Sequence, residues 1–219
     1  VISYEEKTPL KDLTLDNLFI DIGAKDAEEA RKLVQIGDFA VYEAPRFEQN
    51  GVLCGPYLDN RIGCVTLLLM MEQLADKEIE NDLYFVFTAQ EEVGLRGAGA
   101  AAFAVEPDAA IAVDVTDTGD LPEMKSAMVV ELGKGPAVKV MDRSVICTPA
   151  VVDALEQAAK DCGVSAQREI LLCGGTDTSV LQKARAGVQA GAVSIPTRYI
   201  HSPSELCAVS DVEDAAKLL

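Results

Sequence analysis

Two adjacent carboxylates, Glu91 and Glu92, follow a short apolar run at residues 83–87 (LYFVF). The run is rich in aromatic and β-branched residues, which is typical of a buried strand covered on both faces. Ligands of open α/β sheets gather beyond the carboxyl ends of the strands. Because neighbouring side chains on an extended backbone point in different directions, one carboxylate can bind a metal while the other faces a substrate as a base. A solvated pair of glutamates is the simpler alternative.

Three further candidates stand beside predicted elements. Asp59 precedes a predicted helix, Asp114 ends a predicted strand, and His201, the only histidine, follows another strand. Each has an ordinary structural alternative: Asp59 as a helix cap, Asp114 as a turn residue and His201 as a loop histidine. Because parallel strands bring their carboxyl ends to one edge of a sheet, these side chains can also converge there.

Mixed Asp, Glu and His side chains are the ligands that zinc, cobalt and manganese accept. A shared aspartate can bridge two ions about 3.5–4 Å apart in a hydrolytic site. A neighbouring glutamate that is not a ligand is the natural base for activating water. The residue types therefore indicate a metal-dependent hydrolytic site.

Helical and strand patterns alternate from residue 57 onward, which predicts an α/β fold with a largely parallel sheet and helices on both faces. Helices are expected over residues 62–75, 97–104, 148–161, 176–186 and 209–219. Strands are expected over residues 83–87, 109–113, 128–132, 169–173 and 190–195, the last stopped by Pro196.

The first part of the chain has a different character. Residues 15–22 and 36–43 are strand-like, and residues 26–34 predict a helix with an acidic first turn. Glycine and proline around residues 51–56 mark a boundary. The predicted division is a small β-rich part, residues 1–52, and an α/β domain, residues 53–219.

Composition restricts the class of partner. The net charge of -17 over 219 residues argues against nucleic acid, whose phosphates require clusters of Lys and Arg. The six cysteines show no CxxC motif, which favours buried free thiols and a reducing compartment. No signal peptide or apolar run of membrane-spanning length is visible. We expect a cytoplasmic protein without a membrane partner.

Four blocks of sequence, in order, resemble one family. They are YLDNRIGC at residues 57–64, TAQEEVGLRGA at 88–98, AVDV at 112–115, and CGGTDT at 173–178 continuing to SIPTRYIHSP at 194–203. They are similar to the glutamyl-aminopeptidase-type metallopeptidases, metallopeptidase family forty-two, which includes the tetrahedral aminopeptidases. The resemblance implies a phosphorylase/hydrolase-like three-layer α/β sandwich with an inserted β-rich dimerisation domain, of which residues 1–52 form part. It also implies peptide substrates and a homo-oligomer, from a dimer to a dodecamer.

The family pattern also implies roles for single residues. Asp59 resembles the ligand that bridges two divalent ions, zinc or cobalt with manganese also accepted. Glu92 and His201 resemble the ligands of one ion, Asp114 resembles a ligand of the other, and Glu91 resembles the general base.

One feature departs from the family pattern. The family's early His-x-Asp motif, which supplies another ligand, has no counterpart, so the ion paired with Asp114 has only Asp59 and Asp114 from this chain. Both ends of the sequence look cut. The expectation is therefore a fragment of a longer polypeptide, weakly active or inactive alone.

Two other functions remain open. A glycoside hydrolase, matching the endoglucanase label that some relatives have carried, would use Glu91 with another carboxylate and would survive chelation. Against it, the aromatic content is 5% and Trp is absent. A non-catalytic homologue that kept the fold and lost the site is the second alternative.

Overall fold

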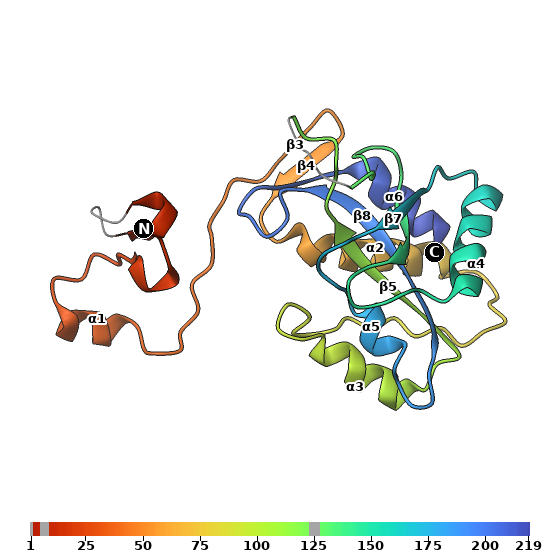
Figure 1. Cartoon of the computed structure of the whole chain (residues 1–219), viewed down its shortest axis with the longest axis horizontal. Coiled ribbons are helices and arrows are strands. Elements are labelled where there is room, and N and C mark those ends of the chain that lie inside the picture. Colours follow the sequence, from red (N-terminus) through yellow and green to blue (C-terminus); the bar gives the residue numbers. More distant parts are fainter. Residues whose placement is uncertain (1, 5–8, 123–127) are drawn as a thin grey trace. The chain divides into compact units, whose positions relative to one another are not determined.

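The computed structural model describes residues 2–4, 9–122 and 128–219 (Figure 1). The chain forms two compact units, Val1–Val41 and Tyr42–Leu219. The role of residues 1–52 as part of a dimerisation domain stays a prediction. No helix in the described part of the chain combines the length and the hydropathy that crossing a membrane requires.

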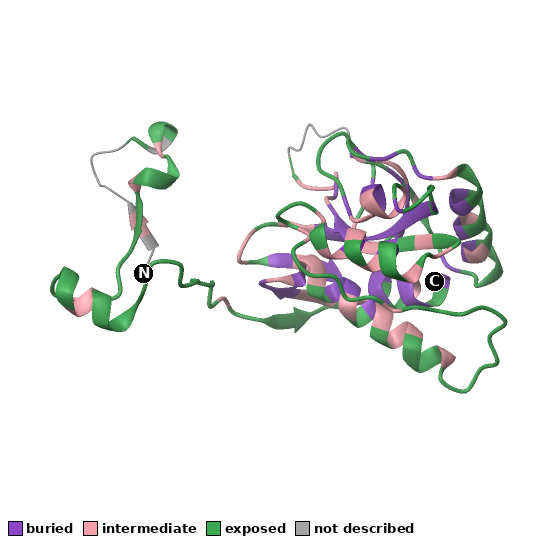
Figure 2. Cartoon of the chain, turned by 90° about the horizontal axis from the view of Figure 1, so that it is seen from below, coloured by how far each residue is buried: buried purple, intermediate pink, exposed green. Residues whose placement is uncertain are grey.

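The smaller unit consists of short elements. They are β1 (Ile2–Tyr4), two 3-10 helices (Leu10–Asp12 and Leu15–Asn17), β2 (Leu18–Ile20) and α1 (Ala27–Leu33). β1 and β2 pair antiparallel, and the Asp26 side chain caps α1 as the acidic start of this helix predicts. Figure 2 shows that none of the side chains described in this unit is buried. Residues 36–43 form no strand, so that prediction is wrong; Ile36 and Phe39 are fully exposed.

A seven-stranded sheet forms the centre of the larger unit. Its strands are β3 (Phe47–Gln49), β4 (Val52–Gly55), β5 (Ala109–Thr116), β6 (Ala137–Met141), β7 (Gln167–Ile170), β8 (Gln189–Arg198) and β9 (Glu205–Ala208). Their order is β3-β4-β9-β8-β6-β7, with β5 paired to β8 outside this path. The β5–β8 and β6–β7 pairs are parallel and the others antiparallel. The sheet is thus more mixed than predicted, because short connections join β3 to β4 and β8 to β9 and cannot hold a crossover.

Helices cover both faces of this sheet, which makes three layers (Figure 1). α2 (Leu58–Leu74), α4 (Pro149–Asp161) and α6 (Val209–Leu218) share the main hydrophobic core with the strands. α3 (Arg96–Val105) and α5 (Thr178–Leu181) lie at a second, smaller cluster. Along β5, Val113 and Val115 contact the first cluster and Ala110 the second, as alternating side chains require.

The five helices predicted for residues 53–219 are present with shifted ends. α2 begins earlier than predicted, at Leu58, and α5 is shorter, ending at Leu181. The helical conformation does not continue through the predicted range because Arg185 lies at φ 52°, in the left-handed region.

Two predicted strands are wrong. Residues 83–87 form no ladder with any described strand, and Leu83, Tyr84, Val86 and Phe87 are 40–65% exposed. Their composition favours extended backbone, but a strand also requires a hydrogen-bonded neighbour. Residues 128–132 also lie outside the ladders. The Val130 carbonyl accepts from the Gly119 amide, and the Glu131 amide donates to the Gln167 side chain.

Pro196 does not stop β8, which continues to Arg198. The last residue of β8 paired with β5 is Pro196, opposite Thr116, and pairing with β9 begins at Thr197. The missing N–H of proline therefore falls where the strand changes neighbours. Strand 169–173 is displaced towards the N-terminus, to β7.

The six cysteines are free thiols, as predicted. Cys54, Cys147 and Cys207 are buried. Cys162 and Cys173 are exposed, so the expectation of burial is wrong for these two.

Candidate metal centre

The start of α2 positions Asp59. Asp59 and Asn60 have non-helical backbone angles, and the peptide bond between them is cis. The Asn60 side chain accepts from the Gly63 amide at 3.1 Å and donates to the Val113 carbonyl of β5 at 2.8 Å. Asn60 rather than Asp59 therefore caps the regular helix and ties it to the sheet. The Asp59 carboxylate is left to face the neighbouring loops.

Glu91 and Glu92 lie in the loop before α3. The loop folds back on itself through a hydrogen bond of 3.0 Å from the Gly97 amide to the Ala89 carbonyl. Gln90, directly before Glu91, has φ 62°, which is uncommon for a residue with a side chain. The turn thus sets the direction of the two carboxylates that follow it.

Asp114 and His201 come from the sheet and its next loop. Asp114 is buried in β5 opposite Ser194 of β8, and its Oδ1 accepts from the Val115 amide at 2.9 Å. His201 lies in the loop between β8 and β9 with φ 61°, and 65% of its side chain is exposed. Asp114 is therefore shielded from solvent within the sheet, whereas His201 lies in a solvent-exposed loop.

Three predicted ligands come together. Asp59, Glu92 and His201 each offer one ligand atom, and these atoms all lie within 4.8 Å of one another. His201 Nε2 is 3.1 Å from Asp59 Oδ2 and 3.5 Å from Glu92 Oε2. We call these three residues the ligand cluster. Asp114 is not in it, although the charges of Asp59 and Glu91 act on Asp114.

Burial and crowding disfavour the charged carboxylates of the site. Burial, and to a smaller extent the charge of the Glu92 carboxylate, raise the pKa of Asp59 to about 6, although the charge of His201 lowers this pKa. Burial, followed by Asp177 and Glu92, raises the pKa of Glu91 to about 7. Burial above all holds the pKa of Asp114 well above its usual range. A divalent cation is the kind of group that stabilises such carboxylates in their charged form.

The ligand cluster fits a divalent metal ion. Bonds of about 2.0–2.2 Å in a tetrahedral site place the ligand atoms about 3.3–3.6 Å apart, close to the two distances from His201 Nε2. Two carboxylates and one imidazole are a ligand set that zinc accepts, with a fourth position left for water or substrate. A second ion would have Asp59 and Asp114 as its ligands among the described residues.

Sequence reasoning missed two acidic residues at the site. Asp117, just after β5, lies close enough to His201 for the charge of His201 to act on the pKa of Asp117. Glu205 is a buried carboxylate at the start of β9 and accepts from the amides of Asp59 and His201. The only signal for Glu205 in the sequence is an acidic residue four positions after the single histidine, next to an apolar strand.

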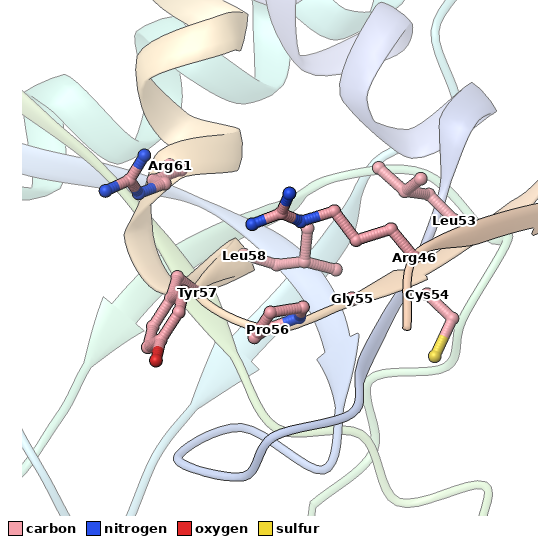
Figure 3. Close-up of a pocket in the computed structure, with 8 residues that line it drawn as sticks. All are labelled: Arg46, Leu53, Cys54, Gly55, Pro56, Tyr57, Leu58 and Arg61. Atoms are coloured by element: carbon pink, nitrogen blue, oxygen red, sulfur yellow. The ribbon is translucent and has the colours of Figure 1, made fainter. Parts of the chain in front are cut away.

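A cavity of about 280 Å³ lies beside the start of α2 (Figure 3). Its lining comprises Arg46, Leu53, Cys54, Gly55, Pro56, Tyr57, Leu58 and Arg61. Arg198 forms an ion pair with Asp120 at 2.6 Å, whereas Arg61 extends at the rim of the cavity.

The solved structures similar to this chain include aminopeptidases and one described as an endoglucanase. An aminopeptidase from the archaeon Desulfurococcus kamchatkensis has a TM-score of 0.94 and 36% identity, over 99% of this chain and 62% of its own. The TET1 peptidase of Pyrococcus horikoshii, which can assemble into a tetrahedron or a large octahedral shell, has a TM-score of 0.84 and 34% identity, over 98% of this chain and 62% of its own. A Thermotoga maritima structure described as an endoglucanase has a TM-score of 0.77 and 32% identity, over 100% of this chain and 62% of its own. The fold is that of the α/β aminopeptidases.

The chain belongs to the M42 glutamyl aminopeptidase family, which matches residues 2–218. The lysyl aminopeptidase of Pyrococcus furiosus is 38% identical over 207 residues, covering 93% of this chain and 58% of that protein. The glutamyl aminopeptidase of Lactococcus lactis is 30% identical over 208 residues, covering 94% and 58%. The chain spans between 58% and 66% of the length of the curated relatives that it matches.

Proposed function

We propose that this chain carries the ligand cluster and the general base of a metal-dependent aminopeptidase that removes N-terminal residues from peptides, and that it is weakly active or inactive alone, because the described residues offer a second ion only Asp59 and Asp114. The convergence of Asp59, Glu92 and His201 from three separate elements carries this proposal. Membership of the aminopeptidase family supports the reaction and the class of substrate.

Asp59, Glu92 and His201 would hold one divalent ion, zinc or cobalt, with manganese also compatible. Asp59 would be shared with a second ion that Asp114 also binds. A bound divalent ion would polarise the scissile carbonyl and stabilise the charge that develops on its oxygen.

Glu91 is the proposed general base. It neighbours the ligand cluster but is not one of its three ligands. Its carboxylate would take a proton from the attacking water and pass it to the leaving amine. A pKa of about 7 suits a group that must accept and release a proton near neutral pH.

Assembly and specificity are proposed by analogy with relatives. The large assemblies of the P. horikoshii peptidase support a homo-oligomer, whose size light scattering would measure. Relatives named for lysyl and for glutamyl substrates show that family membership alone does not identify the preferred N-terminal residue. An activity panel should therefore include basic, acidic and aliphatic N-termini.

The test compares Glu91→Gln with the wild-type chain after addition of zinc or cobalt and desalting. The metal content of both proteins is measured first. We expect the variant to keep as much metal as the wild-type chain and to lose about 10²–10⁴-fold of the turnover that the wild-type chain shows, since general-base catalysis contributes about that much. Glu213→Gln is the matched control, because Glu213 is an exposed residue of α6 and is not part of the ligand cluster. Full activity of Glu91→Gln would rule out its role as base.

A glycoside hydrolase is the second candidate, favoured by the endoglucanase description of the Thermotoga maritima structure. It predicts hydrolysis of a β-glucan that survives removal of metal by a chelator. The aminopeptidase proposal predicts the opposite: cleavage of peptides that stops on chelation and returns when zinc or cobalt is restored. Metal binding without hydrolysis of either substrate would favour the non-catalytic homologue.

A further inference from the structure

Glu205 joins two parts of the ligand cluster through their backbones. Its Oε2 accepts from the Asp59 amide at 2.9 Å, and its Oε1 accepts from the His201 amide at 3.0 Å. Glu205 is only 3% exposed. Each oxygen of one buried carboxylate is therefore bonded to a different residue of the ligand cluster.

The sheet fixes the backbone of Glu205. It is the first residue of β9, paired with Gly55 of β4, and the next residue, Leu206, pairs with Arg198 of β8. Strands on both sides therefore hold this carboxylate in place. The start of α2 and the loop after β8 each gain a hydrogen bond to the same rigid point.

The loop that carries His201 needs such a support. Tyr199 and His201 have φ of 60° and 61°, in the left-handed region that residues with a side chain avoid. A backbone of this kind persists only where its surroundings hold it. Without the hydrogen bond from the His201 amide to Glu205, fewer contacts would hold the loop in the conformation that places His201 Nε2 beside Asp59 Oδ2.

We propose that Glu205 is a positioning residue that sets the distance between Asp59 and His201 and thereby preorganises the ligand cluster for a divalent cation. This inference rests on the proposed function, because it assigns the bridge a purpose in metal binding. A merely structural role predicts instead that loss of the carboxylate weakens the fold without a specific effect on metal affinity.

The chain contains a matched control. Asp211 of α6 is also a buried carboxylate that accepts two backbone N–H groups, from Gly133 at 2.7 Å and from Gly135 at 2.9 Å. Neither glycine belongs to the ligand cluster. Glu205→Gln and Asp211→Asn thus make the same chemical change, the loss of one acceptor and of a buried charge, inside and outside the site.

The experiment measures the affinity of the purified chain for Zn²⁺ by calorimetry, together with the Tm. We expect Glu205→Gln to weaken zinc binding about 10–100-fold, as loss of supporting groups around metal ligands does. Asp211→Asn should lower the Tm and leave zinc affinity within about threefold of wild type. Unchanged affinity in Glu205→Gln, or equal losses in both variants, would overturn the proposal.

Glu205→Asp separates reach from charge. It keeps both acceptors and the negative charge, but its side chain is one methylene shorter, so its carboxylate does not reach the Asp59 and His201 amides from the same backbone position. We expect it to weaken zinc binding as Glu205→Gln does. Wild-type affinity in Glu205→Asp would mean that charge rather than position matters, and would refute the role.

Amide hydrogen exchange, measured by NMR on the metal-free chain, tests the bridge independently of metal. The Asp59 and His201 amides should exchange faster in Glu205→Gln and keep wild-type rates in Asp211→Asn. Unchanged exchange at both amides in Glu205→Gln would overturn the bridge. If the wild-type chain binds no zinc, the proposed function fails for this chain, and these exchange rates alone decide whether Glu205 positions the two residues.

Discussion

Residues with a left-handed backbone conformation lie at or beside the proposed ligands and base. Tyr57, Gln90, Tyr199 and His201 all have φ near 60°. Such conformations cost about 1–3 kcal/mol each and persist where neighbouring contacts determine them. At the scale of single residues, the site is therefore a set of carboxylates and one imidazole whose directions are imposed by the backbone around them.

Arg198, at the end of β8 and three residues before His201, forms an ion pair with Asp120. Burial alone would raise the pKa of Asp120, but the Arg198 guanidinium and the Leu132 amide outweigh it and lower the pKa to about 2. A carboxyl with a depressed pKa stabilises the fold above its unfolded pKa of about 3.9 and loses that contribution as the pH falls through 2.

We therefore expect Asp120→Asn to lower the free energy of unfolding by about 1 kcal/mol at pH 7, the scale of a partly screened ion pair. The difference from wild type should shrink between pH 4 and pH 2. Urea unfolding at several pH values measures it. Glu156→Gln, which breaks the exposed pair with Arg168, is the control and should have a smaller effect. A difference that grows as the pH falls would contradict the assignment.

At the scale of elements, the packing of α3 controls the loop that carries the proposed base. A Cβ on Gly97 would lie 2.6 Å from both the amide nitrogen and the carbonyl oxygen of Ala89, which are backbone atoms. A Cβ on Gly99, on the same helix, would meet only the Val180 side chain at an ordinary 3.9 Å. The two glycines thus differ in steric freedom while sharing one helix.

Alanine at these two glycines should change the free energy of unfolding in opposite directions. Gly99→Ala is expected to raise the free energy of unfolding by about 0.5–1 kcal/mol through helix propensity. Gly97→Ala should lower it by about 1–3 kcal/mol, as overpacking does, and should also weaken Zn²⁺ binding by displacing Glu92. Thermal unfolding and zinc calorimetry measure both effects. Equal stability of the two variants would show that α3 moves freely away from Ala89.

Elements near the site were predictable where local pattern and local structure agree. The helices and the strands around Asp114 and before His201 are present because their periodicity and composition suit the elements that form. The segment at residues 83–87 has strand composition but lacks a described strand beside it. The composition of a segment does not predict whether a second strand is available to pair with it.

The same limit applies to the candidate site. Asp59, Glu92 and His201 were predictable as one group, because ends of elements meet at one sheet edge. Glu205 was not, because it acts on backbone amides of residues that only folding brings close. Asn60 was also missed as the cap of α2, since either Asp59 or Asn60 is a suitable capping residue.

At the scale of the whole molecule, a buried charged network joins strands beneath the sheet surface. Lys139 of β6 forms ion pairs with Glu169 of β7 and with Asp142, and the side chains of all three are fully buried. The Thr116 hydroxyl of β5 donates to Glu169 at 2.8 Å. This network gives the sheet an ionic connection in its interior, where removal of one partner leaves uncompensated charge.

Lys139→Met keeps a long side chain at this position and removes the cation. It should lower the free energy of unfolding by about 3–5 kcal/mol, because Glu169 and Asp142 would remain buried without a positive partner. Adding Glu169→Gln to this variant should restore part of the loss, since one of the two uncompensated charges is then removed. Urea unfolding of the single and double variants measures both changes.

Lys217→Met provides the surface control, because the pair of Lys217 with Asp214 on α6 is partly exposed. Its effect should stay below about 1 kcal/mol, the usual range for such pairs. A Lys139→Met protein as stable as the Lys217→Met protein would mean that the buried carboxylates find other compensation. A double variant less stable than Lys139→Met would show that Glu169 is needed for its hydrogen bond with Thr116 more than for its charge.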